Sequence, residues 1–291
     1  MLPWYVLGLL AAACWSVHVV LGKKVLFKQH AIQYITLFSL IGLILILPFS
    51  GRVVWDLEPL VYVLLFVDSL LWVSALVLAF KALRHMEVSQ YIPLENLSVL
   101  VVLFFGVFLL GEELKAIHYL GIFCLVGGGI WLCSDNLHVL WKDKKFLLFG
   151  LAASILYGLS EVFDKIFVSP QTVGLSFSPV DAFSLFFLER LLVVLNFIGL
   201  TFLWYGGFKD VKMSWSLGGH WVLLSAAFDM LANYFYFSAL PLAYVSLLVP
   251  ITRLYTIFDV LIGGRFFHDH RLVHRFLSCG LMLLGVYLVV G

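Results

Sequence analysis

The chain has 291 residues, of which 63% are hydrophobic and only 12% are charged. A soluble protein of this size needs many more charged side chains to cover its surface, whereas apolar windows of about 20 residues, long enough to cross a bilayer, recur from end to end. The net charge is +1 and no basic run is present, which argues against a nucleic-acid-binding protein. The composition predicts an integral membrane protein without a soluble domain.

Apolar runs separated by turn residues or charges predict ten transmembrane helices. The loops between them are short, so consecutive helices are expected to be antiparallel, and helices satisfy the backbone hydrogen bonds that lipid cannot. In chain order the predicted spans are Pro3–Leu21, Ala31–Pro48, Pro59–Phe80, Val88–Leu110, Ala116–Cys133, Phe146–Val168, Asp181–Tyr205, Gly218–Ser238, Ala243–Gly263 and Leu272–Val290.

No motif in the sequence indicates a metal or a cofactor, and we expect neither. The cysteines lack metal-ligand spacing and lie in or at the ends of apolar segments: Cys14, Cys124, Cys133 and Cys279. No phosphate-binding loop is present to support direct use of ATP. A lipid-modifying membrane enzyme is the alternative from another functional class, but its only candidate cluster, His268-Asp269-His270, is interpreted as a solvated turn.

The two halves of the chain, residues 1–140 and 141–291, repeat each other in sequence. Aligning the first span on the sixth places Gly8, Ala11 and Lys23 opposite Gly150, Ala153 and Lys165. Aligning spans three to five on spans eight to ten places Ser89, Pro93, Gly106 and Gly128 opposite Ser246, Pro250, Gly263 and Gly285. Each half has five spans, so the second half enters the membrane from the opposite side. This pattern predicts two inverted five-helix repeats, the usual basis of alternating access.

A motif in each half begins with a proline early in a helix and continues through an apolar run. In the first half it runs from Pro93 through Gly111-Glu112 to a glycine-rich helix ending at Gly129. It resembles the EamA domain of the drug/metabolite transporter superfamily. The second half starts its counterpart at Leu248-Val249-Pro250 but has His268-Asp269 in place of the Gly-Glu pair. The resemblance covers essentially the whole chain and implies an all-α, ten-helix carrier with a central cavity, without implying a substrate.

Charged side chains inside the predicted spans each cost about 2.5–3.5 kcal/mol near the membrane centre, so they are expected to face a cavity or a partner. Glu95 and Asn96 follow Pro93 in span four, and Arg253 follows Pro250 in span nine. We predict that Glu95 and Arg253 bracket a zwitterionic substrate. The structural alternative is that they pair with each other, or with Asp229, and hold one conformation.

A polar stripe on span eight predicts a second part of the cavity wall. Asp229 and Asn233 are four residues apart and share a helix face, and Tyr236 lies on much the same side. Three aromatic residues at depth are further candidates for contact with the substrate, with ordinary packing as the alternative: Trp15, Tyr91 and Tyr157. Trp15 and Tyr157 are equivalent in the repeat.

Four further charged residues are predicted to serve coupling or gating: Asp68, Glu161, Glu189 and Arg190. Glu189 and Arg190 are adjacent and point about 100 degrees apart on a helix, so they are not expected to pair. Asp259 is another acid within a predicted span, whereas Asp164 and Lys165 are expected to reach the interface from a helix end. Acids outnumber bases, which favours cations or zwitterions over anions and makes Glu95 or Asp229 a candidate proton site.

These features predict a secondary active transporter of a small polar metabolite, amino-acid-like, amine or otherwise zwitterionic, with proton coupling or exchange as the candidate drive. Multidrug or hydrophobic-compound efflux is the alternative within transport. The expected partners are the substrate and the lipid bilayer, the expected state is a monomer or homodimer, and the expected location is the cytoplasmic (inner) membrane. Orientation stays open: most of the 18 Lys and Arg follow odd-numbered spans, which places both termini outside, whereas similar ten-helix proteins are expected to have both termini in the cytoplasm.

Overall fold

The computed structural model describes residues 2–26, 31–85, 91, 94–132, 144–204, 209–257 and 272–291. Every regular element within these ranges is a helix. Six helical segments are long and apolar enough to cross a membrane: Trp4–Leu21, Tyr34–Arg52, Pro59–Leu83, Lys144–Val168, Ala182–Leu203 and Gly219–Leu242. Four shorter apolar helices occupy the remaining predicted spans: Ser98–Phe108, Ala116–Leu132, Val245–Ile257 and Leu277–Val290. The predicted all-helical membrane fold is confirmed.

The helices begin and end close to the predicted boundaries. They are α1 (Trp4–Leu26), α2 (Ala31–Ile46), η1 (Leu47–Arg52), α3 (Pro59–His85), α5 (Ser98–Phe108), α6 (Ala116–Leu132), α8 (Lys144–Val168), η3 (Pro170–Val173), α9 (Ala182–Trp204), α10 (Lys209–Ala239), η4 (Leu240–Leu242), α11 (Val245–Thr252) and α13 (Leu272–Val290). The prediction for span eight was wrong at its start, because α10 continues through Gly218 and Gly219. Glycine costs only about 1 kcal/mol inside a helix, so a glycine pair does not by itself end a long one.

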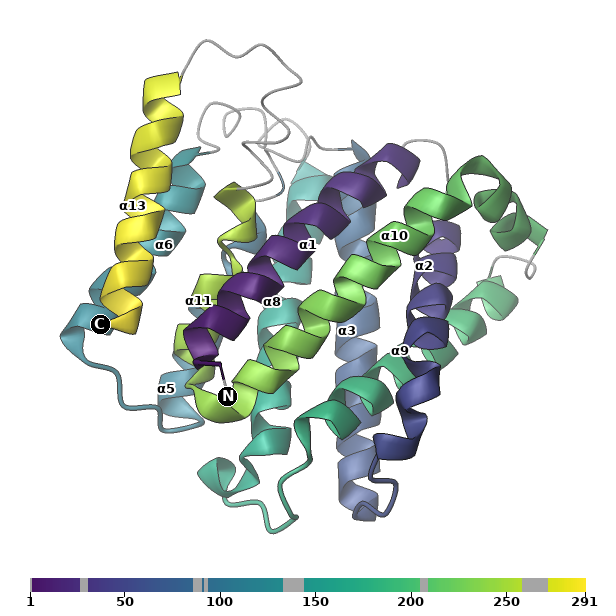
Figure 1. Cartoon of the computed structure of the whole chain (residues 1–291), viewed down its shortest axis with the longest axis horizontal. Coiled ribbons are helices and arrows are strands. Elements are labelled where there is room, and N and C mark those ends of the chain that lie inside the picture. The colour runs from purple at the N-terminus through teal and green to yellow at the C-terminus, as the bar shows by residue number, and fades with distance from the viewer. Residues whose placement is uncertain are drawn as a thin grey trace.

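Helices from the two halves of the chain pack against each other rather than forming separate bundles (Figure 1). The contacts occur in equivalent pairs. Replacing each helix by its counterpart in the other half turns one contact of a pair into the other. α1 packs on α10 as α8 packs on α3, and α1 meets α11 as α8 meets α5. In the same way α2 contacts α10 and α9 contacts α3, while α6 and α13 pack on each other. In Figure 1 both termini lie in the lower half of the view, with the C-terminus at the left and above the N-terminus.

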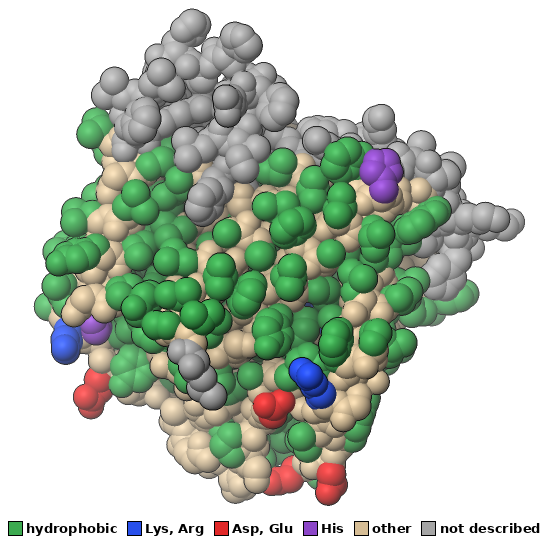
Figure 2. Space-filling model, viewed as in Figure 1, with side chains coloured by type: hydrophobic (Ala, Val, Ile, Leu, Met, Phe, Trp, Pro, Cys, Tyr) green, Lys and Arg blue, Asp and Glu red, His purple; other side chains and the backbone are tan. Residues whose placement is uncertain are grey.

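The outer surface of the helices is strongly apolar. Figure 2 shows hydrophobic side chains over most of the visible face, with the charged side chains gathered toward its lower end. Phe108, Leu203 and Tyr287 are each more than 70% exposed. A soluble protein rarely leaves such large apolar patches uncovered, whereas a membrane protein presents them to lipid.

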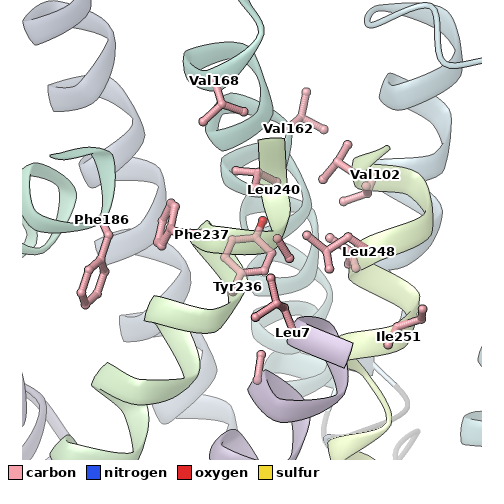
Figure 3. Close-up of a cluster of buried hydrophobic side chains, with 14 of the residues drawn as sticks. Leu7, Val102, Val162, Val168, Phe186, Tyr236, Phe237, Leu240, Leu248 and Ile251 are labelled. Atoms are coloured by element: carbon pink, nitrogen blue, oxygen red, sulfur yellow. The ribbon is translucent and has the colours of Figure 1, made fainter. Parts of the chain in front are cut away.

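The centre of the molecule is closely packed where α1, α10 and α11 meet. Figure 3 shows the ring of Tyr236 among aliphatic side chains, near Leu7 of α1 and Leu240. Gly8 lets α1 approach closely, because a Cβ atom there would lie 3.2 Å from both Ile251 Cγ2 and Leu248 Cδ1. This packing places α11 in the interior, and all of its residues are buried.

The Gly-Glu pair after α5 has a structural role that links the two halves. Gly111 has a positive φ of 66°, a conformation that glycine adopts at no steric cost, and it turns the chain after α5. The Glu112 carboxylate then accepts hydrogen bonds from the backbone N–H groups of Val245 and Ser246, at 2.7 and 3.0 Å. An acid at this position caps the N-terminus of α11 and complements its dipole. The counterpart pair, His268-Asp269, lies outside the described residues.

The expectation that Asp164 and Lys165 reach the membrane interface was wrong. Both are buried, and Lys165 Nζ donates hydrogen bonds to the carbonyl oxygens of Leu240 and Ala243, at 2.9 and 2.8 Å. The turn between α10 and α11 packs against this end of α8, so protein occupies the position where headgroups were expected. Lys165 therefore satisfies the carbonyl groups that the end of α10 leaves free.

Candidate functional site

The two spans that carry the proline motif are interrupted helices. The chain forms turns at Asn96-Leu97 and at Arg253-Leu254, and the repeat alignment places these two breaks opposite each other. The predicted spans Val88–Leu110 and Ala243–Gly263 are therefore not uniform helices. Pro250 lacks a backbone N–H and disturbs the helix before the second break; Pro93 lies outside the described residues.

The backbone hydrogen bonds around the two breaks are also equivalent. In the first half the N–H of Leu97 donates to the carbonyl of Leu94 at 3.0 Å, and in the second the N–H of Leu254 donates to Ile251 at 3.1 Å. Each is a tight bond to the third residue back, typical of a 3₁₀ turn. Two further bonds of this kind follow each break, again at matching positions: Val99 to Asn96, Leu100 to Leu97, Thr256 to Arg253 and Ile257 to Leu254.

Arg253, at the second break, is the centre of a buried ionic network. Its Nη2 atom lies 2.6 Å from Glu161 Oε1 and 2.8 Å from Ser98 Oγ. Its Nη1 atom lies 3.9 Å from Glu95 Oε1, a looser contact. The structure thus brings together Glu95 and Arg253, the predicted substrate residues, and adds Glu161, which the sequence placed in the coupling set. The repeat alignment could not identify Glu161 as a partner because it compares halves and not neighbouring helices.

Several buried polar groups near Arg253 have no hydrogen-bond partner among the described residues. They are Arg253 Nε and Tyr91 Oη, and both polar atoms of the Asn96 amide, beside Gly129 of α6, are likewise unpaired. Tyr91 and Tyr157 lie close enough to Glu95 and Arg253 to interact with their charges. Unpaired buried groups are uncommon because each costs free energy, so this set offers hydrogen-bonding capacity to a ligand.

A second network is centred on Asp229 in α10. Asp229 Oδ1 accepts hydrogen bonds from Trp15 Nε1 at 3.2 Å and from Asn233 Nδ2 at 3.0 Å. Asp229 Oδ2 lies 3.4 Å from Arg190 Nη2. The predicted polar stripe therefore does face the protein interior, and Tyr236 completes it through ring contact with Trp15 at 5.7 Å. Asp229 pairs with Arg190 and not with Arg253, which was the alternative pairing.

A third group consists of the acids Asp68, Asp164 and Glu189, on α3, α8 and α9. Each contributes one carboxylate oxygen to a set in which all three lie within 4.8 Å of one another. Ser160 Oγ donates to Asp68 Oδ1 at 2.5 Å, and Tyr236 Oη donates to Asp164 Oδ2 at 3.3 Å. Sequence reasoning did not place Asp164 in the interior, because it considered only how close this residue lies to the end of its helix.

Helix α8 is the element that these groups share. Tyr157, Glu161 and Asp164 recur at intervals of three or four residues and so lie on one helix face, a signal that could have identified Asp164. The repeat relation also extends to contacts. Trp15 meets Asp229, and their repeat equivalents, Tyr157 and Trp72, meet with ring centroids 5.0 Å apart. Equivalent positions in the two halves are thus in contact in both cases, but the side chains that meet are chemically different.

Some features of the chain lie apart from this site. Asp259 and the cluster His268-Asp269-His270 fall outside the described residues. An apolar groove of about 400 Å³ lies between α1 and α13, and its lining contains no charged side chain: Tyr5, Leu9, Leu254, Leu283, Val286, Tyr287, Val290 and Gly291. Its residues suit contact with lipid.

Residues 2–134 match the family described as the EamA-like transporter family. The chain is therefore similar to this family over its first half. Among solved structures, one crystal structure is similar over 98% of this chain and 96% of its own, with a TM-score of 0.73 and 16% sequence identity. That likeness shows that nearly the whole chain shares the fold of this structure, and at this identity it shows the fold alone. No curated protein matches the chain.

The match over residues 2–134 indicates a membrane transporter of the drug/metabolite transporter superfamily. Together with the apolar helices, it makes the chain a multi-pass integral membrane protein. Neither the fold nor the family match specifies a substrate.

Proposed function

We propose that this EamA-like protein is a secondary transporter of a small zwitterionic metabolite, such as an amino acid or a related amine. The observation that carries the proposal is the incompletely used guanidinium of Arg253. Its Nη1 contact with Glu95 is loose at 3.9 Å, and its Nε has no partner among the described residues. A carboxylate is the preferred partner of a guanidinium, and Nη1 and Nε can each donate a charge-assisted hydrogen bond to one.

Glu95 supplies the complementary charge for the amino group of the substrate. Its side chain is 21% exposed, more than that of either Arg253 or Glu161. At 3.9 Å the Glu95–Arg253 contact is longer than the 2.7–2.9 Å of a charge-assisted hydrogen bond, so a ligand can separate the pair at small cost. The substrate carboxylate would replace Glu95 on the guanidinium, and Glu95 would turn to the substrate ammonium.

The interrupted helices support binding at this depth. In transporters with inverted repeats, discontinuous helices near the membrane midplane form the substrate site where the repeats meet. Here the two breaks occupy equivalent positions in the repeat. Each helix contact also has a counterpart between the equivalent helices of the other half. We propose that residues 1–140 and 141–291 form two inverted repeats, and that rocking of one against the other exposes Arg253 to each side in turn.

Transport rather than catalysis is the proposed activity, because the polar groups at Arg253 form ion pairs and hydrogen-bond donors suited to recognition. We expect no cofactor. A polar substrate is favoured over the hydrophobic compounds of multidrug efflux, since the buried donors would be left unpaired by an apolar ligand. The proposed location is the inner membrane, as a monomer or homodimer.

A thermal-shift screen of the purified protein against amino acids, amines, nucleosides, nucleotides and sugar phosphates tests this function. A ligand that binds the folded state raises its stability, by about 2.7 kcal/mol at a hundred times its Kd. We expect zwitterions to raise the melting temperature of the wild type and of Arg52→Gln, an exposed control. They should fail to do so for Glu95→Gln. Stabilisation by hydrophobic cations alone would contradict the proposal.

A further inference from the structure

The acids Asp68, Asp164 and Glu189, hereafter the carboxylate trio, are enclosed where α3, α8 and α9 meet. Their side chains come from three different helices, yet one oxygen of each lies within 4.8 Å of the other two. The residues are 0%, 4% and 7% exposed. Three carboxylates are thus held close together at a depth where water does not screen their charges.

Each member of the trio also keeps an oxygen that is buried and has no hydrogen-bond partner among the described residues. These atoms are Asp68 Oδ2, Asp164 Oδ1 and Glu189 Oε2. A buried carboxylate oxygen is costly unless a donor or a cation satisfies it. Each of the three clustered acids therefore has an acceptor that no described protein group satisfies.

The nearest basic side chains are engaged elsewhere. Lys165 follows Asp164 in the chain, but its Nζ atom donates to backbone carbonyls at the end of α10. Arg190 follows Glu189, but its guanidinium pairs with Asp229. In the described part of the chain no ion pair reaches the trio, so its charge calls for a cation from outside the protein.

The repeat relation shows that the fold does not need acids at this position. Ser160 and Asp68, which are hydrogen-bonded, align with His18 and Ser225 in the other half. His18 Nδ1 and Ser225 Oγ are also within hydrogen-bond distance, at 2.9 Å. Neutral groups thus make the equivalent helix contact, and the carboxylates are a specific feature of one side of the molecule.

We propose that the carboxylate trio binds a small hard metal cation, for which sodium is the probe. A cation among oxygens no more than 4.8 Å apart lies within about 2.8 Å of each, and a slight closure gives the 2.3–2.6 Å typical of hard cations of this size. Hydroxyl oxygens of Ser160 and Tyr236 adjoin the trio and supply further ligands. Magnesium fits poorly, because it retains several waters that this enclosed position leaves little room for.

The proposed site adjoins the Asp229 network and shares helix α8 with the Arg253 network. Tyr236 contacts Asp164 through its hydroxyl and Trp15 through its ring, and Trp15 in turn donates to Asp229. The cation can bind whether or not the protein transports a zwitterion. A role as a coupling ion does rest on the proposed function. In that role α8 would connect the trio to Glu161, which pairs with Arg253.

The test compares the melting temperature of the purified full-length protein in sodium, potassium, calcium and choline chloride at one pH and equal ionic strength. We expect sodium to raise the melting temperature of the wild type above that in choline. Half-saturation should need at least tenfold more sodium in Asp68→Asn, Asp164→Asn and Glu189→Gln. Asp56→Asn, an exposed control, should respond as the wild type does.

Direct binding of radioactive sodium to the wild type, displaced by unlabelled sodium, keeps the proposal testable if a variant fails to fold. Equal melting temperatures in all four salts, with no displaceable sodium, would overturn the proposal. A melting temperature that responds only to pH would assign protons to the trio and would equally overturn it. Arg253→Gln separates the two proposals, because it should lose the response to zwitterions and keep the response to sodium.

Discussion

Arg253 Nη2 lies 2.6 Å from Glu161 Oε1, and both side chains are buried between α8 and the break that follows α11. The contact is short enough for a charge-assisted hydrogen bond. It fixes the guanidinium through Nη2, and it leaves Nη1 with only a loose contact and Nε without a partner among the described residues. A strong ion pair at Nη2 thus holds two further donors in place for a ligand.

Removal of one partner of this pair is expected to destabilise the protein strongly. Glu161→Gln or Arg253→Gln leaves an uncompensated buried charge, which costs about 3–5 kcal/mol. The double variant should recover most of that loss, because the one charge left there is that of Glu95, which is partly exposed. Unfolding of the purified variants measures this, with Arg52→Gln as the exposed control. Additive losses in the double variant would show that the two side chains do not interact.

Glu112 is expected to stabilise the junction between the halves. Glu112→Ala removes the acceptor of the Val245 and Ser246 N–H groups, and loss of a helix cap costs about 0.5–2 kcal/mol. Glu113→Ala, at an exposed neighbouring position, should change little. The melting temperatures of the two variants measure the difference. An equal effect of both would mean that the cap does not contribute.

Gly106 is expected to tolerate no side chain. A Cβ atom there would lie 2.0 Å from Ser246 Oγ, so Gly106→Ala should force α5 away from α11, at a cost of about 1–3 kcal/mol typical of overpacking. Gly127→Ala, where nothing lies within 4 Å, should be neutral or stabilising. Adding Ser246→Ala to Gly106→Ala should restore part of the lost stability. A melting temperature that Ser246→Ala leaves unrestored would contradict the proposed clash.

The contact between Trp15 and Asp229 is expected to couple α1 to α10. Trp15→Phe keeps most of the ring but loses the donor to Asp229 Oδ1, and a hydrogen bond to a charged group contributes about 1.5–3 kcal/mol. A double-mutant cycle with Asp229→Asn measures the interaction, since two residues in contact should not act additively. Trp215→Phe, at an exposed tryptophan of α10, is the control. Additive effects of the two substitutions would show that Trp15 and Asp229 do not interact.

Much of the fold could be predicted, because a chain that crosses lipid must satisfy its backbone hydrogen bonds within its own helices. Long apolar runs must form helices, so eight of the spans begin close to the predicted residue. α10 begins earlier than predicted, at Lys209, and the predicted start of span four, Val88, lies outside the described residues. The proximity of Glu95 and Arg253 could also be predicted, because the repeat alignment placed them at related depths.

The partners of the buried charges could not be predicted in the same way. Hydropathy places a residue along the membrane normal and does not say which helix packs against it. Lys165 was assigned to the interface because nothing in its own helix shows that the η4 turn packs there. The role of Glu112 was hidden for the same reason, since its acceptors serve a helix more than 130 residues away.

The central claim is that Glu95 and Arg253 bind a zwitterion that the protein carries across the membrane. The most direct test is counterflow of the zwitterion found in the screen, measured in proteoliposomes that contain wild type, Glu95→Gln or the control Glu58→Gln. Glu95→Gln is expected to reduce counterflow at least tenfold with an unchanged melting temperature, because Glu95 is partly exposed and only loosely paired. Wild-type counterflow in Glu95→Gln would contradict the account.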